Sequence, residues 1–359
     1  MLFNLWAHAS YFLKDFVIYI ILLISSFTLL VIGAFKIYKS ALSPRRKKII
    51  LALASTAFCL VLVFSFFEAY FRYVYDESDG LGYLKVNQRW NDRHVIFNSY
   101  FVRDRDFNFD KKEEITRIGV MGDSLAFGAG IKNVDNRFSN LLEKKLKETG
   151  ENVEVYNFGK PGHDTQAEIE EYRKLKTLNF DIIVWEYYLN DIQPQESSTG
   201  TPIINRNSQR AEIVKLMSDK SFFLDFLYWR FSSKYQKTIQ DLKTADLNQY
   251  KNAEVLESHK KAIKDFLDEL KSDNKQVVVI IFPFIQFLGP SYPAEEIHKQ
   301  MSGYFSENGV QVIDLLPDLK DKSPKEVMAS RFDAHPNEFV HRLATERLYE
   351  KVTVLLSDQ

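Results

Sequence analysis

The chain has 359 residues, enough for one large or two ordinary domains, and its 45% hydrophobic and 26% charged residues are ordinary for a globular protein. The net charge of −1 falls to −7 when the six cations of one short loop are left out, so we expect no nucleic-acid partner. The only cysteine is Cys59, so the chain cannot form an internal disulfide.

Residues 1–73 are strongly apolar and contain two uncharged stretches, 16–35 and 49–67. The length of each stretch is close to that of a helix that crosses a bilayer, which needs about 20 residues. Residues 36–48, between them, carry six cations and no acid, which is typical of a cytoplasmic loop. We therefore expect a two-helix transmembrane hairpin in the lipid bilayer, with the rest of the chain extracytoplasmic, either periplasmic or extracellular. A signal peptide is the alternative for the first stretch, although its apolar core would be shorter.

Residues 74–114 are polar, aromatic and irregular, and we interpret them as a stalk or lead-in to a domain at 115–359. Strand-like apolar runs then alternate with helical patterns, which predicts an α/β fold with a parallel sheet covered on both faces. The five runs lie within residues 115–123, 152–159, 181–191, 276–284 and 310–319.

Residues 193–253 interrupt this alternation and form an insertion after the third predicted strand. Within it, residues 221–236 read "SFFLDFLYWRFSSKYQ" and are unusually aromatic. Three interpretations stay open: a lid over a site, a face resting on the membrane, or a small satellite core.

A last helix is predicted near residues 337–356. Its apolar stripe is made of Phe339, Leu343, Leu348, Val352 and Leu355. The same spacing places His341 on the polar face of the helix.

Chemistry-bearing residues follow several of the predicted strands or precede the last helix. Parallel sheets gather their functional loops at the carboxyl ends of the strands, so these residues are expected to meet. They are Ser124 in "GDS", Gly162 in "NFGKPG", Asn190 in "LND", and Asp333 and His335 in "DAH".

Together these residues supply what acyl transfer by a serine requires. His335 can take the proton of the Ser124 hydroxyl, and Asp333 can bind the other ring nitrogen and hold the tautomer. The backbone N–H groups of Ser124 and Gly162 and the side-chain amide of Asn190 can donate to an oxyanion.

Each residue also has a purely structural interpretation. Ser124 can cap a helix, Asn190 can form a turn, Gly162 can satisfy an unusual backbone conformation, and His335 can cap the last helix. The seven histidines do not cluster at metal-ligand spacing. We therefore expect neither a metal nor another cofactor.

The four blocks, in this order, resemble those of the SGNH, or GDSL-type, hydrolases, over about residues 115–357 without the insertion. The resemblance implies a three-layer α/β/α sandwich of about five parallel strands, flavodoxin-like. It makes Ser124 the nucleophile, His335 the base with Asp333 behind it, and Gly162 and Asn190 oxyanion donors. The lead-in "NSYFVRDRDF" also resembles that of membrane-anchored bacterial members.

Two positions depart from the family pattern. Tyr188 stands where the third block usually has glycine. Only Ala334 separates Asp333 from His335, where two residues are usual, and Phe332 fills the usual aspartate position. Exported polysaccharide O-acetyltransferases resemble this chain in their Asp-x-His spacing.

The resemblance implies a serine esterase that acts on an acylated small molecule or glycan, and O-acetylated glycans of the cell envelope fit the expected location. The first alternative is an O-acyltransferase of an exported polysaccharide that uses the same acyl-serine. The second is a non-catalytic envelope protein that keeps the fold.

Overall fold

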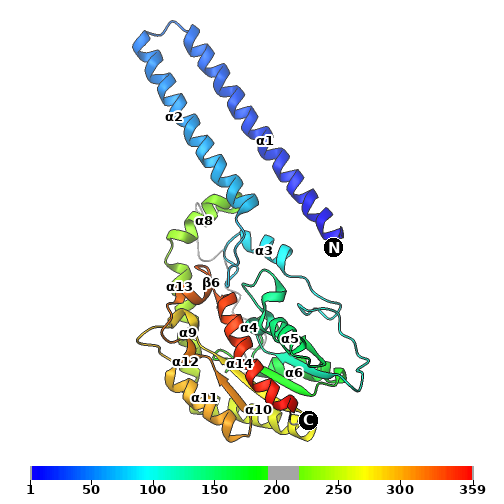
Figure 1. The fold of residues 1–359 in the computed structure, drawn as a ribbon. Coiled ribbons are helices and arrows are strands. Elements are labelled where there is room, and N and C mark those ends of the chain that lie inside the picture. The colour runs from blue at the N-terminus through cyan, green and yellow to red at the C-terminus, as the bar shows by residue number, and fades with distance from the viewer. Residues whose placement is uncertain (1, 193–217, 358–359) are drawn as a thin grey trace. The chain divides into compact units, whose positions relative to one another are not determined.

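The computed structural model describes residues 2–192 and 218–357 (Figure 1). Packing divides the chain into two units. The first contains residues 1–76 and 210–231, and the second contains residues 77–209 and 232–359. Residues 193–217, where the predicted insertion begins, lie outside the described part of the chain.

The first unit is helical: α1 (Leu2–Lys39), α2 (Pro44–Ala69), the π-helical turn η1 (Tyr70–Val74) and α8 (Phe222–Phe231). Two segments, Ile20–Lys39 and Pro44–Val74, are long and apolar enough to cross a bilayer. Their apolar side chains are not buried within the protein. A helix that is apolar on every face needs an apolar environment, so both segments are candidate membrane spans.

The aromatic segment of the predicted insertion packs against the end of α2. The Glu68 carboxylate accepts hydrogen bonds from Ser221 Oγ at 2.6 Å and from the Phe223 backbone N–H at 3.0 Å, at the start of α8. The rings of Phe71 and Phe226 stack with centroids 4.1 Å apart. A buried carboxylate and stacked rings therefore hold α8 in the first unit.

The second unit is built on a five-stranded parallel sheet in the order β2-β1-β3-β4-β5. The strands are β1 (Thr116–Met121), β2 (Val153–Asn157), β3 (Ile182–Tyr188), β4 (Gln276–Phe282) and β5 (Gln311–Asp314). All seven residues of β3 are buried, because it lies at the centre and both faces are covered. The predicted parallel sheet of about five strands is confirmed.

Helices cover both faces of the sheet, which gives the predicted three layers. On one face lie α5 (Phe138–Glu148) and α14 (Glu338–Ser357), where the rings of Phe138 and Phe282 are 6.0 Å apart. On the other lie α6 (Thr165–Leu175), α10 (Ala253–Ser272) and α11 (Glu295–Glu307), which contact the central strand through Trp185. The remaining elements are short or lie outside the three layers: α3 (Val86–His94), α4 (Ser124–Phe127), η2 (Val134–Asn136), η3 (Lys176–Leu178), α9 (Lys234–Gln249), η6 (Ile285–Phe287), α12 (Leu316–Leu319), α13 (Pro324–Val327), β6 (Met328–Ser330) and β7 (Asp333–Pro336).

The buried face of α14 differs from the predicted stripe at its first turn. Phe339 is 40% exposed, whereas Val340 and His341 are fully buried. His341 Nδ1 accepts a hydrogen bond from the Phe138 N–H at 3.2 Å, and burial lowers the pKa of the imidazole to about 3. The prediction of a polar-face histidine was wrong because α14 packs against α5 as well as the sheet, so its buried face is wider than one stripe.

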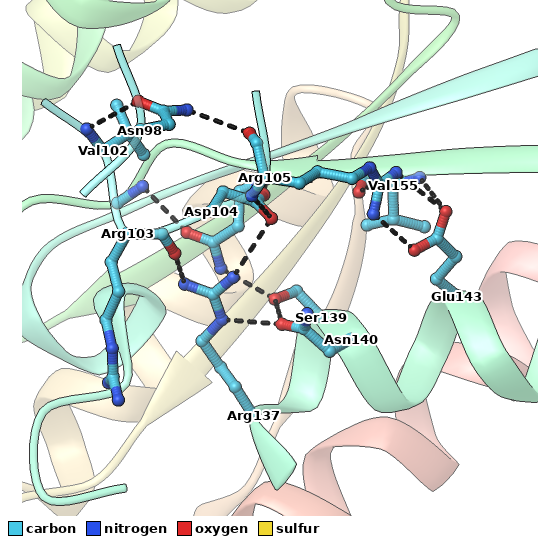
Figure 2. Close-up of polar contacts among 12 residues, drawn as sticks. Asn98, Val102, Arg103, Asp104, Arg105, Arg137, Ser139, Asn140, Glu143 and Val155 are labelled. Atoms are coloured by element: carbon cyan, nitrogen blue, oxygen red, sulfur yellow. Dashed lines mark hydrogen bonds and ion pairs between the residues drawn. The ribbon is translucent and has the colours of Figure 1, made fainter. Parts of the chain in front are cut away.

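Of the lead-in predicted at 74–114, residues 77–114 belong to the second unit and are bound to it by arginines, of which Arg103 and its neighbour Arg137 are buried. The Arg103 guanidinium donates to the carbonyls of Gly128 and Ile131, both at 2.6 Å. Figure 2 shows how Arg137 reaches the Arg103 carbonyl, at 2.8 Å, and how Arg105 pairs with Glu143 through two hydrogen bonds. The lead-in thus fixes the loop that follows α4.

Arg103→Met is expected to lower the free energy of unfolding by about 3 kcal/mol, because it leaves buried carbonyls without donors. Arg173→Met is the matched control. Two guanidinium nitrogens of Arg173 donate to the Glu269 carboxylate, but the Arg173 side chain is exposed. Thermal unfolding of the full chain in detergent measures both. Equal shifts in melting temperature for the two variants would show that the buried hydrogen bonds of Arg103 add no more stability than an exposed ion pair.

Candidate active site

Ser124 lies at the carboxyl end of β1, where a sharp turn starts the short helix α4. A Cβ on Gly122 would lie 2.5 Å from Glu186 Oε2 and 2.9 Å from Ala126 Cβ, and φ there is 150°, so the turn requires glycine. The Asp123 carboxylate caps α4 by accepting from the Leu125 N–H at 2.8 Å. The cap is therefore Asp123, and the Ser124 hydroxyl is not needed for it.

The structure brings Ser124, His335 and Asp333 together. His335 Nε2 lies 2.9 Å from Ser124 Oγ, and His335 Nδ1 is hydrogen-bonded to Asp333 Oδ1. Asp333 and His335 both lie on β7, which pairs with β6 as a two-stranded antiparallel ribbon. Side chains two residues apart in a strand point to the same side, which explains how one intervening residue still allows the contact.

Charge and burial act in opposite directions on the Asp333–His335 pair. Burial alone would lower the pKa of His335, but the charge of Asp333 and its hydrogen bond outweigh it and raise that pKa above its usual 6.5. Burial would raise the pKa of Asp333, but the charge of His335 and the hydrogen bonds it and Ser78 make keep that pKa low. The pair thus combines an ionised carboxylate with an unusually basic imidazole.

The acidic limb of kcat/KM is expected to have its midpoint above pH 6.5. Only neutral His335 can accept the serine proton, and its raised pKa means that the neutral form is lost as pH falls through a higher value than usual. A pH–rate profile with a soluble ester measures this midpoint. A midpoint well below 6.5 would mean that Asp333 does not act on the imidazole.

The Asn190 amide shares a hydrogen-bond partner with Ser124. Its Nδ2 donates to Asp123 Oδ2 at 3.3 Å, and Ser124 Oγ lies 3.3 Å from the same oxygen. Asn190 follows β3, so neighbouring strands β1 and β3 supply the two groups. The amide can therefore reach an oxyanion formed at Ser124.

Gly162 lies in a turn that follows β2. The Lys160 N–H donates to the Gly122 carbonyl at 3.1 Å, which ties this turn to the turn that carries Ser124. Gly162 has φ of 79°, a conformation that by itself favours glycine. The turn that carries Gly162 is thus adjacent to the turn that carries Ser124. The backbone conformation at position 162 is by itself a reason for glycine there.

A buried carboxyl group contacts the turn that carries Ser124. The sequence analysis did not identify it as part of the site. Glu186, fully buried on β3, accepts from the N–H groups of Asp123 at 3.1 Å and Ala126 at 3.2 Å. Burial, reinforced by the charges of Asp123 and Asp191, raises the pKa of Glu186 well above its usual range. The signal that could have found it is one charged residue inside an otherwise apolar central strand.

Helix α9, from the predicted insertion, places Lys243 over two aromatic rings that follow or end the central strands. Lys243 lies 4.6 Å above the Tyr188 ring and 4.8 Å above the Phe284 ring, which meet edge to face. The positive charge of Lys243 counters part of the effect of Asp333 on the pKa of His335. Tyr188 therefore forms part of an aromatic wall at the position where the family pattern has glycine.

A model of the GDSL-like lipase/acylhydrolase family matches residues 120–343, more than half of the chain. No curated protein matches the chain.

Similar solved structures include TesA, with 12% identity, 67% of this chain and 99% of that chain covered, and a TM-score of 0.43. The esterase EstA from Pseudoalteromonas sp. has 13% identity, coverage of 67% and 99%, and a TM-score of 0.39. The lipase/acylhydrolase from Enterococcus faecalis has 15% identity, coverage of 66% and 95%, and a TM-score of 0.40.

Proposed function

Because the chain belongs to the GDSL-like lipase/acylhydrolase family and is a hydrolase of ester bonds, we propose that Ser124, His335 and Asp333 form its catalytic triad. The observation that carries the proposal is the 2.9 Å contact between His335 Nε2 and Ser124 Oγ, with Asp333 on the other ring nitrogen. This arrangement joins a nucleophile, a base and a group that orients the base.

The proposed reaction runs through an acyl-serine. His335 takes the proton of Ser124 as its oxygen attacks the ester carbonyl, and returns that proton to the departing alcohol. His335 then takes a proton from water as the water attacks the acyl-serine, and gives it to Ser124 Oγ as that ester bond breaks and the acid is released. The N–H groups of Ser124 and Gly162 and the Asn190 amide stabilise the oxyanion, and one such donor is typically worth about 3–4 kcal/mol in the transition state.

We further propose that the enzyme is anchored by its two N-terminal helices with the catalytic domain outside the cytoplasm. The support is the two candidate spans and the six cations between them. In this location, acylated glycans of the cell envelope, O-acetylated sugars among them, are the substrates within reach. Protease added to cells with a permeabilised wall would then degrade the catalytic domain while the plasma membrane is intact.

Active-site labelling tests the triad. The full chain in detergent is treated with a fluorophosphonate, and mass spectrometry locates the modified residue. We expect one adduct, on Ser124, formed faster as pH rises through the pKa of His335. An adduct on another serine, or ester hydrolysis without any adduct, would contradict the proposal.

An O-acyltransferase is the second candidate, and the Asp-Ala-His spacing favours it through its resemblance to exported polysaccharide O-acetyltransferases. The acyl-serine is the same, and the acceptor decides: water in a hydrolase, a sugar hydroxyl in a transferase. Product analysis with an acyl donor and an envelope polysaccharide distinguishes the two. Acylated polysaccharide formed at the expense of free acid would identify a transferase.

A further inference from the structure

Residues 78–84, in the predicted lead-in, lie directly against the proposed catalytic acid. The Ser78 side chain is hydrogen-bonded to the Asp333 carboxylate. The Ser330 hydroxyl donates in turn to the Ser78 carbonyl, at 3.4 Å. Ser78 and Asp333 are both buried, 6% and 1% exposed, so this contact is shielded from water.

The backbone next to Asp333 is fixed by the same region. The Phe332 carbonyl accepts hydrogen bonds from the Gly80 N–H, at 2.9 Å, and from the Tyr235 hydroxyl on α9. A Cβ on Gly80 would lie 3.2 Å from Asp333 Oδ1 and 3.5 Å from His335 Nδ1. Gly80 does not have a left-handed φ, so a side chain here would be tight only because this segment lies against the Asp–His pair.

The segment is itself held in one conformation. The Asp79 carboxylate accepts from the N–H groups of Leu81 and Leu84, and the Asp79 N–H donates to Asn87 Oδ1 at 3.1 Å. Tyr83 is fully buried and its ring packs edge to face on Tyr235, with centroids 5.8 Å apart. Ser78 therefore presents its hydroxyl from a rigid support.

We propose that Ser78 is a positioning residue: its hydroxyl donates to the Asp333 carboxylate and, with Gly80 and Tyr235 fixing the adjacent backbone, aims that carboxylate at His335. The backbone N–H and Nδ1 of His335 both bind Oδ1 of Asp333. A carboxylate accepts more bonds than these two, and Ser78 supplies one from a distant segment. The proposal rests on the proposed triad.

Ser78→Ala is expected to lower kcat by about 10- to 100-fold with KM unchanged, because one hydrogen bond to a buried charge is lost. Ser78→Thr keeps the hydroxyl and should recover most of the activity. Thr345→Val is the matched control, since the buried Thr345 hydroxyl on α14 donates to the backbone carbonyls of Phe138 and His341 and not to a carboxylate. It should lose comparable thermal stability and keep kcat.

A double-mutant cycle separates positioning from general destabilisation. In an Asp333→Ala background, Ser78→Ala should slow fluorophosphonate labelling of Ser124 no further. An equal fold-loss in both backgrounds, or an unchanged kcat for Ser78→Ala alone, would overturn the proposal.

Two further measurements cover a variant that does not fold and a failure of the proposed triad. If Ser78→Ala does not fold, Ser78→Cys is compared with Ser78→Thr, because a thiol is a weak donor. Failure of the proposed triad is seen separately, as a wild-type chain with no adduct on Ser124.

Discussion

Ser124→Ala is expected to abolish ester hydrolysis, with kcat reduced by about 10⁵- to 10⁶-fold. In the proposed mechanism the Ser124 hydroxyl supplies the atom that forms the new bond. Among the described residues it is the hydrogen-bond partner of His335 Nε2, at 2.9 Å. The turn itself is stabilised by Asp123 and Glu186, so the melting temperature should change little. Hydrolysis of p-nitrophenyl acetate and fluorophosphonate labelling measure the loss.

Ser139→Ala is the matched control for this variant. Ser139 is buried, whereas Ser124 is half-buried, and the Ser139 hydroxyl accepts from Asn157 Nδ2 at 2.9 Å. This variant should keep both hydrolysis and the adduct. Retained labelling of Ser124→Ala would place the nucleophile elsewhere.

Asp333→Asn is expected to lower kcat by about 10³- to 10⁴-fold. An amide can donate to His335 Nδ1, which leaves the ring proton on Nε2, facing the hydroxyl that has to be deprotonated. The negative charge that raises the pKa of His335 is also lost, so that pKa falls and the acidic limb of the residual activity moves to lower pH. The decrease in kcat and the shift of the acidic limb to lower pH should therefore occur together, and a pH–rate profile measures both.

A second Asp–His pair in the same unit gives the control. His298 Nδ1 lies 2.8 Å from Asp314 Oδ1, without a serine on the other nitrogen, where Tyr292 is bound instead. Asp314→Asn should leave kcat within a few-fold and the limb in place. Equal losses for the two variants would mean that Asp333 acts only through stability.

The sheet and its convergent strand ends could be predicted because both depend on local patterns. Apolar runs define the strands, and parallel pairing brings their carboxyl ends to one edge, which is how Ser124 and Asn190 meet. The contact of Asp333 with His335 is also local, since alternate residues of a strand share a side.

Other parts of the site depend on contacts that leave no local pattern. Ser78 and Gly80 lie in an irregular stretch, and their contact with Asp333 spans more than 250 residues of sequence. His341 shows the same limit: helical spacing alone does not determine how wide a face the neighbouring elements cover. Tertiary packing decides these positions.

Under the proposed membrane anchoring, the place of Ser78 in the chain restricts where the enzyme could be released with its site complete. Ser78 follows Val74, the last residue of η1, by only four positions. A protease that cuts within those few residues would release an enzyme that still has Ser78 in place against Asp333. A cut about ten residues further on would keep the whole sheet but remove Ser78 together with the buried Tyr83 and Leu84, so we expect the released product to be catalytically impaired.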